Sequence, residues 1–129
     1  MILPPIVATI GRIILVSLFL LGGLNKLINY DATLAMMQRG GLNPASFLLP
    51  AVIALELGGG ALVAFGKRFA VPAALMLAVF TIATNLVFHR FWAMSGPVAA
   101  LELSLFFKNV AIAGGLLFVA ATLARPDAK

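Results

Sequence analysis

Five ionisable side chains lie within, or at the ends of, long apolar stretches of this chain: Arg12, Lys26, Glu56, His89 and Lys108. If such stretches span a membrane, each charge costs about 2.5 to 3.5 kcal/mol to insert, so these residues usually face the interior of a helix bundle and pair there. Glu56 is the sharpest case, because a carboxylate in the middle of an apolar helix is too short to reach the membrane surface. We therefore expect Glu56 to be either paired or protonated.

Helical geometry predicts that these polar groups gather in one half of a bundle. At a rise of roughly 1.5 Å per residue, Glu56 lies roughly 13 Å from its helix end and Lys108 roughly 9 Å past Glu102, so we favour Lys108 as the partner of Glu56. Asn85 and His89 share one helix face. The candidate ligand-binding residues are Arg12, Lys26, Glu56, Asn85, His89, Lys108 and Asn109, and Glu56 and His89 are also candidates for a proton relay.

Each of these residues also has a structural interpretation. Lys26 can extend its ammonium to the lipid headgroups without any further role, and His89 can be an ordinary interfacial histidine. Arg12 lies nearer the opposite end, where it can reach the membrane surface or cap helix carbonyls. An ion pair of Glu56 with Lys108 can serve only to fix how the helices pack. The glycines at 58–60 favour close approach of a neighbouring helix.

The composition is that of a membrane protein. Hydrophobic residues make up 63% of the 129 residues and charged residues only 10%, whereas soluble domains carry about 25% charged residues. The chain has no cysteine, which excludes disulfides and thiolate chemistry. It has a single histidine, which argues against a metal site built from protein ligands alone. The nine Lys and Arg residues are scattered, so the net charge does not indicate nucleic-acid binding.

The apolar segments predict an all-α fold, a membrane four-helix bundle in a single transmembrane domain. Each segment approaches or exceeds the roughly 20 residues that a spanning helix needs. The domain covers residues 1–129, with predicted helices at 5–28, 47–65, 69–89 and 98–123. Between the first two, Asp31 can cap a short helix that Gly40 and Gly41 end. We expect this short helix to lie at the membrane interface.

Four spans place both chain termini on the same side of the membrane. That side carries Lys67, Arg68, Arg125 and Lys129, and the first two stand in a very short loop. Short loops rich in Lys and Arg remain in the cytoplasm. We therefore predict that both termini are cytoplasmic.

Four motifs follow one another along the chain. They are GRIILVSLFLLGGLNKL with Arg12 and Lys26, ELGGGALVAFG with Glu56, HRFW with His89, and Lys108-Asn109 with AGGLL shortly after. Their order and spacing resemble the DoxX family of small four-helix membrane proteins over residues 5 to 124. The resemblance implies that the protein lies in a bacterial or archaeal inner membrane. The positions that match the family's motifs are Arg12, Lys26, Glu56, His89 and Lys108. The resemblance also implies a link to redox systems, since some members are associated with a thiosulfate:quinone oxidoreductase or with oxidative-stress complexes that contain soluble partners.

The function we favour is a membrane subunit of an oxidoreductase system that binds a quinone or a similar small apolar ligand. His89 and Lys108 would donate hydrogen bonds to it, and Glu56 would relay protons. No flavin, haem or metal motif is encoded, so electrons must come from a partner or a separate cofactor. Two alternatives stay open: a small oligomeric transporter or channel, and a scaffold that docks a soluble partner enzyme or assembles as a homo-oligomer.

Overall fold

The computed structural model describes residues 1–126; residues 127–129, which include the Lys129 used for the orientation prediction, lie outside the described part. The regular elements are all helical over this range. They are α1 (Pro5–Ile28), α2 (Tyr30–Arg39), α3 (Ala45–Ala54), the π-helix η1 (Leu55–Gly59), α4 (Gly60–Phe65), α5 (Ala70–Phe88), the 3₁₀ turn η2 (Phe91–Ala93) and α6 (Gly96–Leu123). Four helical stretches are long and apolar enough to cross a membrane: Pro5–Ile28, Ala45–Phe65, Ala70–Ala93 and Gly96–Leu123. The predicted all-α membrane bundle is confirmed.

The first span and the ends of the second and fourth have the predicted bounds, and the other helix ends differ from them by one or two residues. α6 begins two residues early, because Pro97 stands in its first turn, where a missing backbone N–H costs nothing. α3 also begins two residues early, directly after Pro44 in extended conformation. α4 ends at Phe65 and is followed by Gly66, whose φ of 67° is left-handed. That conformation suits glycine and turns the chain sharply into α5.

The short helix α2 packs against α3. Its Met37 joins a buried cluster with Ala45, Leu49 and Ile53 of α3. Asp31 does not cap the helix as predicted: the N-cap is Asn29 without a side-chain cap bond, and Asp31 lies in the first turn. A negative charge there still stabilises the helix through its dipole. The location of α2 at the membrane interface remains a prediction.

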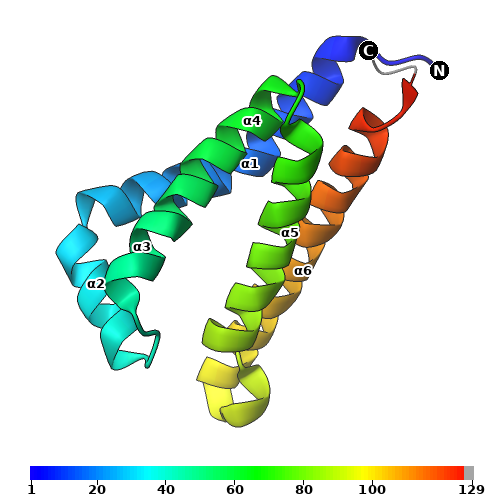
Figure 1. The fold of residues 1–129 in the computed structure, drawn as a ribbon. Coiled ribbons are helices and arrows are strands. Elements are labelled where there is room, and N and C mark those ends of the chain that lie inside the picture. Colours follow the sequence, from blue (N-terminus) through cyan, green and yellow to red (C-terminus); the bar gives the residue numbers. More distant parts are fainter. Residues whose placement is uncertain (127–129) are drawn as a thin grey trace.

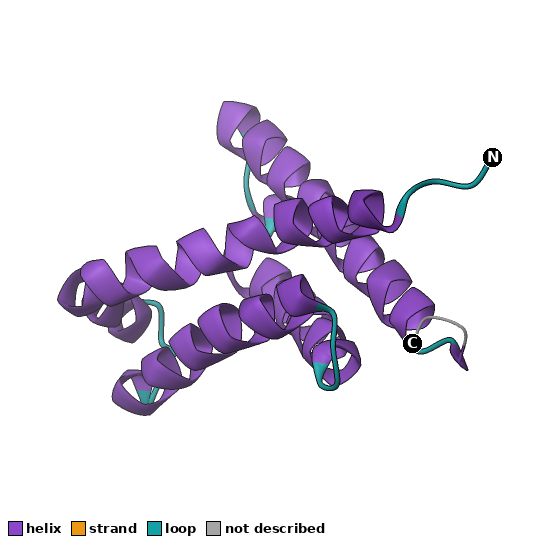
Figure 2. Cartoon of the chain, turned by 90° about the horizontal axis from the view of Figure 1, so that it is seen from above, coloured by secondary structure: helices purple, strands orange, loops and turns teal. Residues whose placement is uncertain are grey.

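The helices are arranged in two adjoining pairs. Figure 1 shows α1 alongside the helix formed by α3, η1 and α4, and α5 alongside α6, with the start of α1 and the end of α6 at the same end of the bundle. Seen from above, α6 crosses α1 (Figure 2). Every span contributes buried residues to the main apolar cluster, among them Val16, Val63, Leu77 and Leu116. This cluster holds the two pairs together.

Candidate functional site

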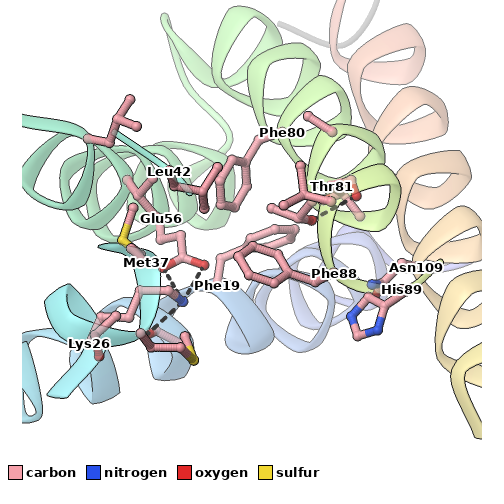
Figure 3. Close-up of a pocket in the computed structure, with 18 of the residues that line it drawn as sticks. Phe19, Lys26, Met37, Leu42, Glu56, Phe80, Thr81, Phe88, His89 and Asn109 are labelled. Carbon is pink, nitrogen blue, oxygen red and sulfur yellow. Dashed lines mark hydrogen bonds and ion pairs between the residues drawn. The ribbon is translucent and has the colours of Figure 1, made fainter. Parts of the chain in front are cut away.

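Glu56 is paired with Lys26 of α1. The Lys26 ammonium Nζ donates to Glu56 Oε1 at 3.1 Å and lies 2.9 Å from Oε2 (Figure 3). Glu56 is buried, whereas Lys26 in the last turn of α1 is half-buried. The carboxylate thus keeps its charge compensated by a cation that also reaches toward the end of its helix.

Glycines on α1 and α4 let the two helices come close enough for this pair. A Cβ added at Gly23 would lie 2.8 Å from Leu57 Cγ and 3.1 Å from Glu56 Cβ, and one at Gly60 would lie 2.9 Å from Leu20 Cδ2. A methyl group at Gly23 would push the helices apart, and one at Gly60 would displace the Leu20 side chain. Gly58, by contrast, has open space around it, so only part of the predicted glycine run makes the close approach.

Glu56 stands in a π-helical turn, which the sequence reasoning missed. η1 interrupts the second span between α3 and α4. Single π-turns within α-helices are rare and occur frequently at functional sites. The run of glycines after Glu56 was the available signal, because glycine weakens the competing α-helix.

The predicted pair of Glu56 with Lys108 is wrong. Lys108 is exposed on α6, and within residues 1–126 Glu56 pairs with Lys26 while Lys108 forms neither a hydrogen bond nor an ion pair. The depth estimate compared positions along the helix axes and ignored rotation about them. Successive helical residues point about 100° apart. Lys108 therefore faces outward, while the neighbouring Asn109 faces the cavity.

A second polar group joins α5 to α6. Asn85, fully buried, donates from Nδ2 to the Phe106 carbonyl at 2.9 Å, and Asn109 Nδ2 donates to Asn85 Oδ1 at 2.9 Å. Near the helix ends, His89 Nδ1 lies 2.6 Å from Glu102 Oε2. Glu102 was not among the predicted site residues. Its position early in the helix that follows His89 was the only signal.

A cavity of about 640 Å³ lies between the first two spans, α2 and α5. Its walls are mainly apolar and include the aromatic rings of Phe19, Phe80 and Phe88. The Lys26–Glu56 pair lies on one side, and His89 with Asn109 lies on the other (Figure 3). The cavity therefore offers an apolar slot with hydrogen-bonding groups at two separate places.

The chemistry available in this cavity is hydrogen bonding and proton transfer. Lys26 and the amide of Asn109 are donors, and the Glu56 carboxyl and the His89 imidazole can each hold or release a proton. Over residues 1–126, the His, Asp and Glu side chains form no group of three that could hold a metal ion. A bound small molecule would meet these groups directly.

Arg12, one of the candidate ligand-binding residues, lies outside this cavity and nearer the opposite end of α1. Its Nη2 donates to Thr9 Oγ1 at 3.2 Å, and its guanidinium packs on Gly66, where an added Cβ would lie 2.7 Å from Cζ. Arg12 borders a smaller hollow of about 350 Å³ between α1 and α6. Four of the seven predicted residues line the cavity: Lys26, Glu56, His89 and Asn109. Asn85 lies behind Asn109, to which it is hydrogen-bonded. Arg12 and Lys108 do not line the cavity.

Comparisons with known proteins agree with the resemblance seen in the sequence. The family model described as DoxX matches residues 7–90. The chain is 32% identical to the inner membrane protein YphA of Escherichia coli (strain K12) over 120 residues, which cover 92% of this chain and 84% of that relative. It is 35% identical to the inner membrane protein YqjF of the same organism over 113 residues, covering 88% and 81%. A comparison with solved structures gave no match.

Proposed function

The chain belongs to the DoxX family of membrane proteins, and from this premise we propose that it is an inner-membrane subunit of an oxidoreductase system that binds a quinone or a similar small apolar ligand. The cavity carries the proposal. Small-molecule sites are concave, mostly apolar and about 300 to 1,000 Å³ in volume, with a few placed polar groups. The cavity of about 640 Å³ meets each of these criteria.

The lining residues fit a ring with two carbonyl oxygens. Phe19, Phe80 and Phe88 offer apolar and aromatic surface to the ring. Lys26 is a donor on one side of the cavity, and Asn109 with His89 supplies donors on the other. Quinone reduction consumes two electrons and two protons. In this proposal Glu56 and His89 hold protons close to the ligand, and the electrons come from a redox partner, because the chain encodes no redox group of its own.

The test is binding to the purified full-length protein in lipid nanodiscs. Short-chain ubiquinone and menaquinone analogues are titrated by calorimetry. We expect saturable binding that Glu56→Gln weakens about tenfold, since replacing a charged hydrogen-bonding group by a neutral one costs about 1 to 2 kcal/mol. Lys108→Met is the matched control. It also removes a charge from a spanning helix, but outside the cavity, and should leave binding unchanged.

The outcome decides among the functions considered above. An absence of saturable binding across several quinone types contradicts the proposal. Solute flux in proteoliposomes that Glu56→Gln abolishes would favour the transporter instead. Equal weakening by Lys108→Met would show that the effect is on the fold and not on the ligand.

A further inference from the structure

Lys108 carries a charge deep within a spanning helix and on its outer face. It is the thirteenth of the 28 residues of α6, so it lies about 18 Å from one end and about 22 Å from the other. A helix of about 42 Å centred in a hydrocarbon core of about 30 Å places this residue about 12 Å below the nearer boundary. The four-carbon stem of lysine covers roughly half of that distance.

Within residues 1–126, no carboxylate pairs with Lys108. The sequence contains four acids. Two stand in spanning helices, and both already have a partner. Glu56 pairs with Lys26, and Glu102 pairs with His89. Asp31 lies in α2, and Asp127 follows the last span in the sequence. Within residues 1–126, Lys108 is the lysine of a spanning helix that has no acidic partner.

The surface around Lys108 allows another helix to approach. Ser104 and Ala111, four residues before and three after it, share its face and are exposed. Small side chains at these positions permit close contact between spanning helices, and hydrogen bonds across such contacts contribute about 0.6 to 2 kcal/mol. A charge facing lipid is costly, whereas the same charge facing a carboxylate on an adjacent helix is compensated.

We propose that this face of α6 docks a spanning helix of a different membrane protein, and that this helix places a carboxylate beside Lys108. Charge complementarity selects the partner. A second copy of the chain does not provide it, because both of its intramembrane acids already have a partner and their side chains are only 7% and 18% exposed. This docking surface lies apart from the cavity, so the proposal stands independently of quinone binding.

The test uses defined peptides and the full-length protein. The chain has no native cysteine, so Ser95→Cys, in the exposed loop just before α6, provides a unique site for a donor fluorophore. The protein is reconstituted in phosphatidylcholine vesicles with an acceptor-labelled Leu/Ala spanning peptide that carries one central Glu, or with its matched Gln peptide. Energy transfer reports association.

We expect the Glu peptide to associate about tenfold more tightly than the Gln peptide, as interhelical polar contacts allow. Lys108→Met should abolish this preference, and Lys67→Met, in the loop before α5, should leave it intact. Lys108→Glu should transfer the preference to a peptide with a central Lys, which guards against a simple loss of fold. Equal association of the Glu and Gln peptides with the unaltered protein overturns the proposal, as does self-association of the chain that depends on Lys108.

Discussion

The replacement of Lys26 by methionine tests what the buried ion pair contributes. The Glu56 side chain is 7% exposed and that of Lys26 is 29% exposed. Glu56 also stands roughly 16 Å along the second span from Ala45. Lys26→Met would leave this carboxylate without a countercharge. Loss of one partner of a buried pair costs about 3 to 5 kcal/mol, and the partial exposure of Lys26 places the expected cost near the lower value, at about 3 kcal/mol.

The reciprocal change should cost less. Glu56→Gln leaves a lysine in the last turn of α1, from where its ammonium can extend to the headgroups, and the glutamine oxygen can still accept a hydrogen bond. We expect about 1 to 2 kcal/mol. The double variant Lys26→Met/Glu56→Gln buries no charge and should lie within about 1 kcal/mol of the unaltered protein, since neutral replacement of a buried pair is often tolerated.

Unfolding in mixed micelles with increasing sodium dodecyl sulfate, followed by circular dichroism, measures these differences. Lys108→Met serves as the control and should not lower the free energy of unfolding, because Lys108 forms no ion pair or hydrogen bond within residues 1–126 and its charge faces lipid. The reasoning fails if the double variant loses as much stability as the two single changes added together, because their coupling would then be zero. It also fails if Lys26→Met is no worse than Glu56→Gln.

Two further changes probe the packing around the cavity in the same assay. Gly23→Ala should destabilise the bundle by about 1 to 3 kcal/mol, because its methyl group would overlap Leu57. Gly114 has open space around it, so Gly114→Ala should be neutral or slightly stabilising. Equal effects of the two changes would contradict the close approach of α1 to the second span. Asn85→Leu should cost about 1 to 2 kcal/mol, since it leaves the Asn109 amide without its acceptor. Asn85→Leu/Asn109→Leu should recover part of that loss, and no recovery would show that the two amides act independently.

The spans could be predicted from the sequence because they depend on a local property. An apolar run of sufficient length must cross the bilayer as a helix, since its backbone groups have no other partners there. The start of α1 at Pro5 follows from the fixed φ of proline, and the end of α4 before Gly66 follows from the left-handed φ of glycine. Even where the bounds differed, as at the start of α6, the residue responsible was visible in the sequence.

The partner of Glu56 could not be predicted in this way. Lys26 and Lys108 both lie at suitable depths, and the choice between them depends on how each helix is rotated about its axis. That rotation is set by contacts between helices, such as the fit of Gly23 against Leu57. The π-turn at Glu56 adds a further local rotation. Similarly, the bond of His89 with Glu102 depends on the path of the chain through η2.

The distribution of polar contacts has a consequence for the cavity. Lys26–Glu56 joins the first span to the second, and His89–Glu102 joins the third to the fourth. Among the described residues, no side-chain hydrogen bond or ion pair connects one pair of spans to the other. The connection is apolar, as where Gly59 meets Leu77. The two polar walls of the cavity are therefore held relative to one another by apolar packing alone, and the ligand proposed for the cavity, if it reached both walls, would add a polar link between the halves.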